Sequence, residues 1–193
     1  LTITDNESAP TVTLGTSATS VAENGSDLTL TATLSVETYA DVIVTLTGSG
    51  TSTAGTDYAS LSTITISTGN TSGTTTFNPT NDSIYEGSET AIIAITNVAG
   101  GSAQESGNQS ETITITDSLA APTVTLTTSA STVSEKASDL TLTATLNRST
   151  YETVTVTLST SGTSTAGTDY ESLSSITISA GSTTGTTAFT LRD

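Results

Sequence analysis

The feature that most limits the possible folds of this chain is a strict alternation of apolar and hydroxyl-bearing residues. Residues 28–34 read Leu-Thr-Leu-Thr-Ala-Thr-Leu, which places the two kinds of side chain on opposite faces of an extended strand. The same period of two recurs at residues 42–46, 64–66 and 113–115. Helical spacing is not sustained anywhere. Short alternating segments separated by Gly, Asn and Ser turns predict an all-β chain that folds as an antiparallel β-sandwich.

The sequence also repeats itself with a period of 112 residues, the difference between positions 135 and 23. Val21-Ala22-Glu23 returns as Val133-Ser134-Glu135, and Gly55-Thr56-Asp57-Tyr58 returns as Gly167-Thr168-Asp169-Tyr170. A repeat of this length is a whole domain, because solenoid repeats span only about 20 to 50 residues.

This period predicts the domain boundaries. We expect one complete domain over residues 6–117 and a second over residues 118–193 that stops before its last two strands. Residues 1–5 match residues 113–117, so we interpret them as the last strand of a preceding repeat. The native protein is therefore expected to continue at both ends.

Strand direction predicts which residues of the complete domain meet. We expect strands near residues 10–16, 19–22, 27–36, 41–48, 61–67, 73–79, 89–97 and 110–117. In an antiparallel sandwich, successive strand ends alternate between two poles. The acidic residues predicted to converge at one pole are Glu23, Asp57, Asp82, Glu86, Glu89 and Asp117.

Composition limits the chemistry of this acidic pole. The chain has 193 residues, 3 Lys or Arg, 19 Asp or Glu, and a formal net charge of −16. Such a surface repels nucleic acid and anionic lipid and attracts cations. The chain lacks Cys, His, Met and Trp, which excludes disulfides, thiolate or imidazole metal sites, and catalysis by Cys or His. Its apolar runs are only a few residues long, so we expect no membrane span.

Carboxylates held close together need solvation, proton uptake or a bound cation. Ca²⁺ is the cation that fits best, because it accepts 6 to 8 oxygen ligands in irregular geometry, whereas Mg²⁺ more often retains its waters. A solvated acidic rim that keeps a surface protein in solution is the alternative interpretation.

The motifs at this pole resemble those of a known family. Val21-x-Glu23, Gly55-Thr56-Asp57-Tyr58, Asn81-Asp82-x-Ile84-Tyr85-Glu86-Gly87-x-Glu89 and Thr114-Ile115-Thr116-Asp117 are similar to the Calx-beta repeat. The resemblance covers nearly the whole chain. It implies an immunoglobulin-like, Greek-key β-sandwich that binds Ca²⁺ at one pole. The implied ligands in the complete domain are Glu23, Asp57, Asp82, Glu86, Glu89 and Asp117, with Ile84 through its carbonyl.

The chain departs from the family pattern at two points. The acidic run that follows the last strand in family members with several calcium ions is replaced by Asp117-Ser118-Leu119, and Asn81 stands where Asp is frequent. We therefore expect one to two ions, bound with dissociation constants of about 10⁻⁴ to 10⁻³ M. In the second repeat Glu135, Asp169 and Asp193 match the motif, but the other ligands have no counterparts, so its site should be vacant or poor.

These features together predict a calcium-binding structural repeat of a large bacterial surface protein resembling an adhesin, located outside the cell. Only about four residues join the two domains, so calcium is expected to stiffen the junction and to turn neighbouring repeats into a stalk or filament. Recognition of cell-surface or matrix ligands is expected in other domains. The alternative function is a calcium-independent, Thr-rich spacer or a ligand-binding adhesin domain whose acidic pole is merely solvated. Glu86 and Glu89 could form a carboxylate pair for glycoside cleavage, but the chain has no Trp and only 2 Phe, so we expect no enzyme.

Overall fold

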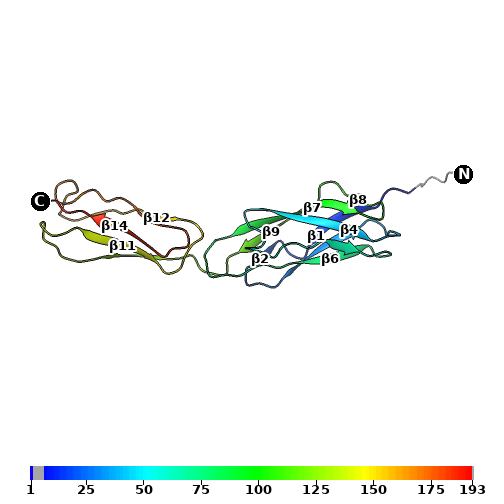
Figure 1. Cartoon of the computed structure of the whole chain (residues 1–193), viewed down its shortest axis with the longest axis horizontal. Helices are drawn as coiled ribbons and strands as arrows, with labels where there is room; N and C mark the ends of the chain where they lie inside the picture. Colours follow the sequence, from blue (N-terminus) through cyan, green and yellow to red (C-terminus); the bar gives the residue numbers. More distant parts are fainter. Residues whose placement is uncertain (2–6, 193) are drawn as a thin grey trace. The chain divides into compact units, whose positions relative to one another are not determined.

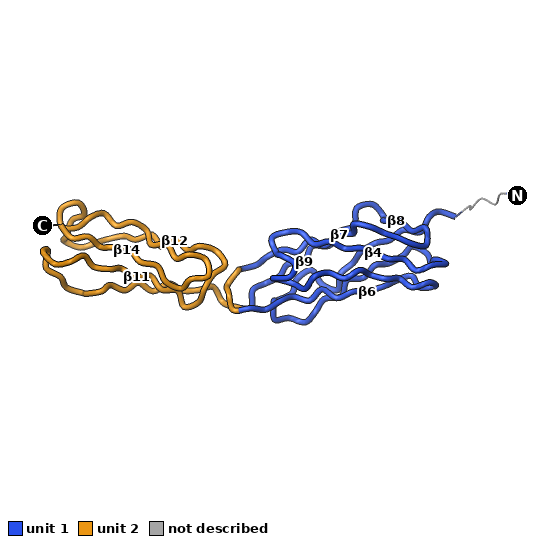
Figure 2. Tube along the Cα trace, in the orientation of Figure 1, with its two compact units in different colours: residues 1–82, 87–118 blue, residues 83–86, 119–193 orange. Residues whose placement is uncertain are grey.

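The computed structural model describes residues 1 and 7–192, which form two compact units (Figure 2). The first unit comprises Leu1–Asp82 and Gly87–Ser118, and the second comprises Ser83–Glu86 and Leu119–Asp193. Residues 2–5, expected to be a strand of a preceding repeat, lie outside the described residues. In the described part of the chain all regular structure is β-strand, and no helix there is long and apolar enough to cross a membrane.

The first unit contains nine strands in its described residues (Figure 1). They are β1 (Thr11–Thr16), β2 (Ser20–Ala22), β3 (Leu28–Leu34), β4 (Val42–Gly50), β5 (Ile64–Ile66), β6 (Ser72–Phe77), β7 (Glu89–Ala99), β8 (Gln104–Glu105) and β9 (Ser110–Thr116). One sheet has the order β6-β3-β1-β8, and the other has the order β2-β9-β7-β4-β5. The two sheets form the predicted β-sandwich.

The core of the first unit lies between these sheets and is built from the inward positions of the alternating strands. In β3 the burial alternates with the sequence, so that Leu28, Leu30, Ala32 and Leu34 are buried. The facing sheet contributes buried isoleucines from β5, β7 and β9. Burial of each such side chain contributes roughly 1.5–3 kcal/mol, which is why the period-two pattern determines the sandwich.

Each of the eight predicted strand ranges overlaps one strand of the structure, but β4 and β7 each extend two residues past the predicted end and β6 begins one residue before the predicted start. β8 was not predicted. It has only two residues and pairs in parallel with Thr11 and Val12 of β1, so its side chains follow no alternation that a sequence pattern could reveal.

One close approach within the first unit requires a glycine. Tyr58 is 1% exposed, and its ring stacks on Phe77 with the centroids 4.8 Å apart. A Cβ added to Gly48 of β4 would lie 2.0 Å from the Tyr58 hydroxyl. The absence of a side chain at Gly48 therefore leaves room for the Tyr58 hydroxyl in the core. Asp57 immediately precedes this buried tyrosine in the chain.

The second unit has five strands among residues 83–86 and 119–192. They are β10 (Val124–Thr128), β11 (Leu140–Leu146), β12 (Val154–Val156), β13 (Ile176–Ile178) and β14 (Thr184–Phe189). Its sheets have the orders β10-β11-β14 and β12-β13. Pairing of Val124 with Leu146 reproduces the pairing of Val12 with Leu34 in the first unit.

The second unit is less well covered than the first. Val124 and Leu126 are 41% and 52% exposed, whereas their counterparts Val12 and Leu14 are 0% and 7% exposed. In the first unit, β1 packs against β7 and β9, and the described residues of the second unit contain no counterparts of these strands. β12 is shorter than β4, the equivalent strand of the first unit. β4 pairs along its length with β7, and the described residues of the second unit contain no counterpart of β7.

Candidate metal centre

Glu23 is positioned by the pairing of β2 with β9. The two strands run in parallel, with Val21 opposite Ile115 and Ala22 opposite Thr116. The Glu23 N–H continues this ladder by donating to the Thr116 carbonyl at 3.0 Å. Because β9 ends at Thr116, the next residue is Asp117, and the ladder brings Glu23 beside it.

Asp57 is held in a turn that its own carboxylate helps to close. The Thr53 N–H donates to Asp57 Oδ2 at 2.5 Å, and the Asp57 N–H donates to the Thr53 carbonyl at 2.9 Å. The Asp57 carbonyl in turn accepts a hydrogen bond from the Thr80 N–H at 2.9 Å. This bond connects Asp57 to the segment between β6 and β7, which contains Asp82 and Glu86. Asp57 is 7% exposed.

The segment between β6 and β7 turns sharply at Gly87, whose φ of 82° favours a residue without a side chain. The Gly87 N–H donates to Asp117 Oδ2 at 3.1 Å. Glu86 and Glu89 flank this turn and are half-buried. One carboxylate oxygen from each of Asp57, Glu86 and Glu89 lies within 4.8 Å of the other two.

Glu23 carries a carboxylate in an unfavourable environment. It is 7% exposed, and its Oε2 atom is buried with no hydrogen-bond partner among the described residues. Burial raises the pKa of Glu23 above its ordinary value, and the nearby Asp117 raises the pKa further. A hydrogen bond from the Ser118 backbone lowers the pKa, while the charges of Asp82 and Asp57 raise it. An orphaned buried oxygen among carboxylates is the environment that a cation would relieve.

These distances are compatible with a calcium ion. Calcium–oxygen bonds measure about 2.3–2.6 Å, so two ligands of one ion lie at most about 5 Å apart. One carboxylate oxygen from each of Asp57, Glu86 and Glu89 lies within 4.8 Å of the other two, which satisfies this limit. Asp57 also belongs to the group of charges around Glu23, so the two sets of carboxylates share a member.

The structure therefore brings together the residues that strand direction placed at one pole. Glu23, Asp57, Asp82 and Asp117 interact electrostatically, and Asp57, Glu86 and Glu89 form the compact cluster. Ile84 is half-buried in the same loop. Sequence reasoning missed the contribution of Ser118. Its backbone donates to Glu23, and its hydroxyl donates to Asn81 Oδ1 at 2.5 Å; a backbone donor leaves no signal in a residue pattern.

The counterparts in the second unit are more open. Asp169 closes the same turn as Asp57, with the Thr165 N–H donating to its Oδ2 at 2.6 Å. Glu135 is exposed, unlike Glu23. Glu135 and Asp169 both line a cavity of about 490 Å³. Asp193, the third expected ligand, lies outside the described residues.

The fold is a β-sandwich module with an acidic pole, and the pairing of its strands recurs in the second unit. The family model of the Calx-beta domain matches residues 5–119 and again residues 117–184. The chain belongs to the Calx-beta domain family and carries two tandem copies of the domain. Calx-beta domains are non-catalytic binding modules that bind Ca²⁺.

Solved structures that are similar to this chain include Calx domains. The apo form of the Calx CBD1 domain aligns with 55% of this chain and 97% of its own length. CBD12 from CALX1.2 and the calcium binding domain CBD12 of CALX1.1 align with 89% and 90% of this chain, and with 72% of their own lengths. All three alignments have 18% sequence identity and a TM-score of 0.47. No curated protein matches the chain.

Proposed function

We propose that the chain binds calcium at the acidic pole of its first repeat, defined by Glu23, Asp57, Asp82, Glu86, Glu89 and Asp117. The observation that carries this proposal is the buried Glu23 Oε2, which has no hydrogen-bond partner in the described structure and lies among other carboxylates. A bound divalent cation would supply the missing partner and would cancel the repulsion that raises the pKa of Glu23.

The carboxylates divide into two groups in this proposal. Asp57, Glu86 and Glu89 are close enough to share one ion. The charges of Asp57, Asp82 and Asp117 all act on Glu23. Glu23, Asp82 and Asp117 would therefore either complete the shell of that ion or hold a second ion. The proposed stoichiometry for the first unit is therefore one to two ions, with dissociation constants of about 10⁻⁴ to 10⁻³ M.

Calorimetric titration of the 193-residue chain with CaCl₂ tests this proposal, with MgCl₂ as the matched cation. We expect saturable calcium binding and weaker magnesium binding, because magnesium gives up its water ligands reluctantly. The double variant Asp82→Ala/Glu86→Ala should bind less calcium. Absence of calcium binding by the unmodified chain at millimolar concentrations would favour a solvated acidic rim and would refute the metal site.

The biological role we propose is that of a repeat in an extracellular stalk or filament of a bacterial surface protein. The tandem family matches and the short segment 117–123 between β9 and β10 support the part of this role that concerns a repeat in a stalk. Calcium at the acidic pole would restrict motion of this segment, since Asp117 belongs to both. Small-angle scattering with calcium and with chelator tests the idea. A longer maximum dimension with calcium is expected, and an unchanged dimension and flexibility would contradict it.

A further inference from the structure

The second unit contains an extended segment that comes from an earlier part of the chain. Residues 83–86 group with this unit, and Tyr85 forms a parallel bridge with Thr150. The Tyr85 N–H donates to the Ser149 carbonyl at 3.0 Å, and the Tyr151 N–H donates to the Tyr85 carbonyl at 3.0 Å. The backbone edge formed by residues 149–151 thus holds residues 83–86 with one acceptor, the Ser149 carbonyl, and one donor, the Tyr151 N–H.

The first unit has an edge of the same construction at residues 37–39, one period of 112 residues earlier. Thr38 and Thr150 each donate their hydroxyl to the carbonyl two residues later, at 2.7 Å in both cases. Each also accepts a backbone hydrogen bond from a glycine, Gly69 at 3.2 Å and Gly181 at 2.8 Å. The two edges therefore have equivalent local structures.

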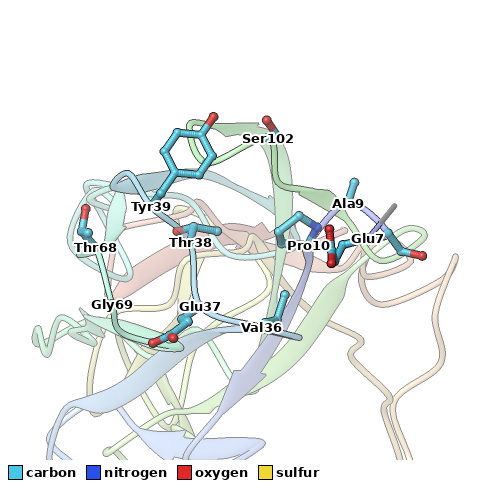
Figure 3. A pocket seen from close by; sticks show the side chains of 12 residues that line it. Glu7, Ala9, Pro10, Val36, Glu37, Thr38, Tyr39, Thr68, Gly69 and Ser102 are labelled. Carbon is cyan, nitrogen blue, oxygen red and sulfur yellow. The ribbon is translucent and has the colours of Figure 1, made fainter. Parts of the chain in front are cut away.

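The two edges differ in occupancy. Within residues 1 and 7–192, the Glu37 carbonyl and the Tyr39 N–H have no hydrogen-bond partner, although their counterparts Ser149 and Tyr151 are paired with Tyr85. Tyr39 is 82% exposed. A cavity of about 620 Å³ adjoins this edge. Figure 3 shows Tyr39, Thr38 and Thr68 on one side of the cavity and Pro10 and Glu7 on the other.

We propose that the 37–39 edge of the first unit is a docking site for an extended segment equivalent to residues 83–86, supplied by a tandem copy of this repeat. The Tyr85-equivalent N–H of that segment would donate to the Glu37 carbonyl, and the Tyr39 N–H would donate back to its carbonyl. These are the two bonds that Ser149 and Tyr151 make in the second unit. Such strand addition derives its affinity from main-chain hydrogen bonds. Docking through these main-chain bonds requires no bound ion.

Side chains around the edge adjust the affinity for this segment. The first unit has Val36 and Glu37 at the positions where the second has Arg148 and Ser149. Because Asp82 and Glu86 give the segment negative charge, Glu37 opposes docking. The variant Glu37→Ser makes the edge resemble that of the second unit and should strengthen binding of the same segment several-fold.

Amide hydrogen exchange measured by NMR on the 193-residue chain tests this inference. Without additions, the Tyr151 N–H should be protected and the Tyr39 N–H should exchange rapidly. The probe is a synthetic peptide of residues 81–88. A tandem copy would present this segment at an effective concentration in the millimolar range, so the free peptide is tested over about 0.1–10 mM. The Tyr39 exchange rate should fall about tenfold at about 90% occupancy.

Two control peptides separate main-chain docking from non-specific association. Tyr85→Pro removes the N–H that bonds to Glu37, whereas Tyr85→Phe retains it. We expect the Phe peptide to protect Tyr39 and the Pro peptide to have no effect. Equal effects of both peptides, perturbation of residues 149–151 in place of residues 37–39, or no perturbation at about 10 mM with both the native chain and Glu37→Ser would overturn the proposal.

Discussion

The Glu23 N–H donates to the Thr116 carbonyl at 3.0 Å, and this bond joins the first acidic residue of the pole to the end of the last strand of the first unit. As a consequence Glu23 lies next to Asp117, and the charge of Asp117 is the largest electrostatic contribution to the raised pKa of Glu23 after burial itself. The fold thus holds like charges together. A bound cation would offset their repulsion.

Replacement of Glu23 by Gln should have opposite effects with and without calcium. In chelator the variant should be more stable than the native chain, because it removes a buried charge that is repelled by Asp117. Calcium at about 100 times its dissociation constant should raise the free energy of unfolding of the native chain by about 2.7 kcal/mol. Glu23→Gln should lose most of this calcium-dependent gain. Urea unfolding with calcium or chelator measures both effects.

The matched control for this experiment is Glu111→Gln. Glu111 lies in β9 opposite Ile93 and is half-buried, but it belongs to neither group of carboxylates at the acidic pole. Glu111→Gln should change the calcium-dependent gain in the free energy of unfolding by less than about 0.5 kcal/mol. Equal loss of the gain in both variants would show that calcium acts on the overall negative charge and not at a defined site.

Stability in chelator should depend on pH through Glu23. The folded-state pKa of Glu23 is raised above 4.5, so the folded protein binds more protons than the unfolded chain above about pH 4.5. The contribution of Glu23 to stability is therefore fully present below that pH and is lost as the pH rises through the raised pKa. Subtracting the pH profile of Glu23→Gln isolates this contribution. A difference profile that is flat between pH 4.5 and 7 would contradict the assignment.

Gly48 should not tolerate alanine. In a strand interior, Gly→Ala ordinarily stabilises by roughly 0.5–1 kcal/mol. At Gly48 the added Cβ would lie 2.0 Å from the Tyr58 hydroxyl, so we expect a loss of about 1–3 kcal/mol. Gly15 in β1 is the matched control, because nothing lies within 4 Å of its added Cβ. Unfolding midpoints that move in the same direction in Gly15→Ala and Gly48→Ala would argue against this packing.

The second unit should contribute little to calcium binding by this chain. Glu135 is exposed, whereas its counterpart Glu23 is 7% exposed, so Glu135 has less repulsion and desolvation for a cation to relieve. Calorimetry should give the same number of bound calcium ions for Glu135→Gln and for the native chain. A reduction equal to that caused by Glu23→Gln would indicate that the two units bind calcium equally.

Much of the fold was predictable because its strands alternate strictly between a buried and a solvent face. The Leu-Thr-Leu-Thr-Ala-Thr-Leu segment of β3 is buried at every second position. The convergence of Glu23, Asp57 and Asp117 was predictable for a related reason, since strand direction determines the pole at which each loop lies. Both predictions use only local geometry and chain direction.

Other features depend on contacts that a residue pattern does not encode. The Glu23 Oε2 atom without a hydrogen-bond partner and the Gly87 N–H bond to Asp117 depend on the tertiary packing of the loops at the acidic pole. The pairing of Tyr85 with Ser149 and Tyr151 is made by backbone atoms, which every residue possesses. The pairing of the Tyr151 N–H and the lack of such pairing at Tyr39 among the described residues cannot be read from the Thr-Tyr pair that both edges carry.

The most direct test of the calcium site is NMR of the side-chain carboxyl carbons of the native 193-residue chain during titration with CaCl₂. We predict that the Glu23 and Asp57 signals shift together and saturate at the same calcium concentration, while the Glu111 signal does not follow them. Small, unsaturating shifts of equal size at all three carboxyl groups would mean that calcium only screens the surface, and would contradict the proposed metal centre.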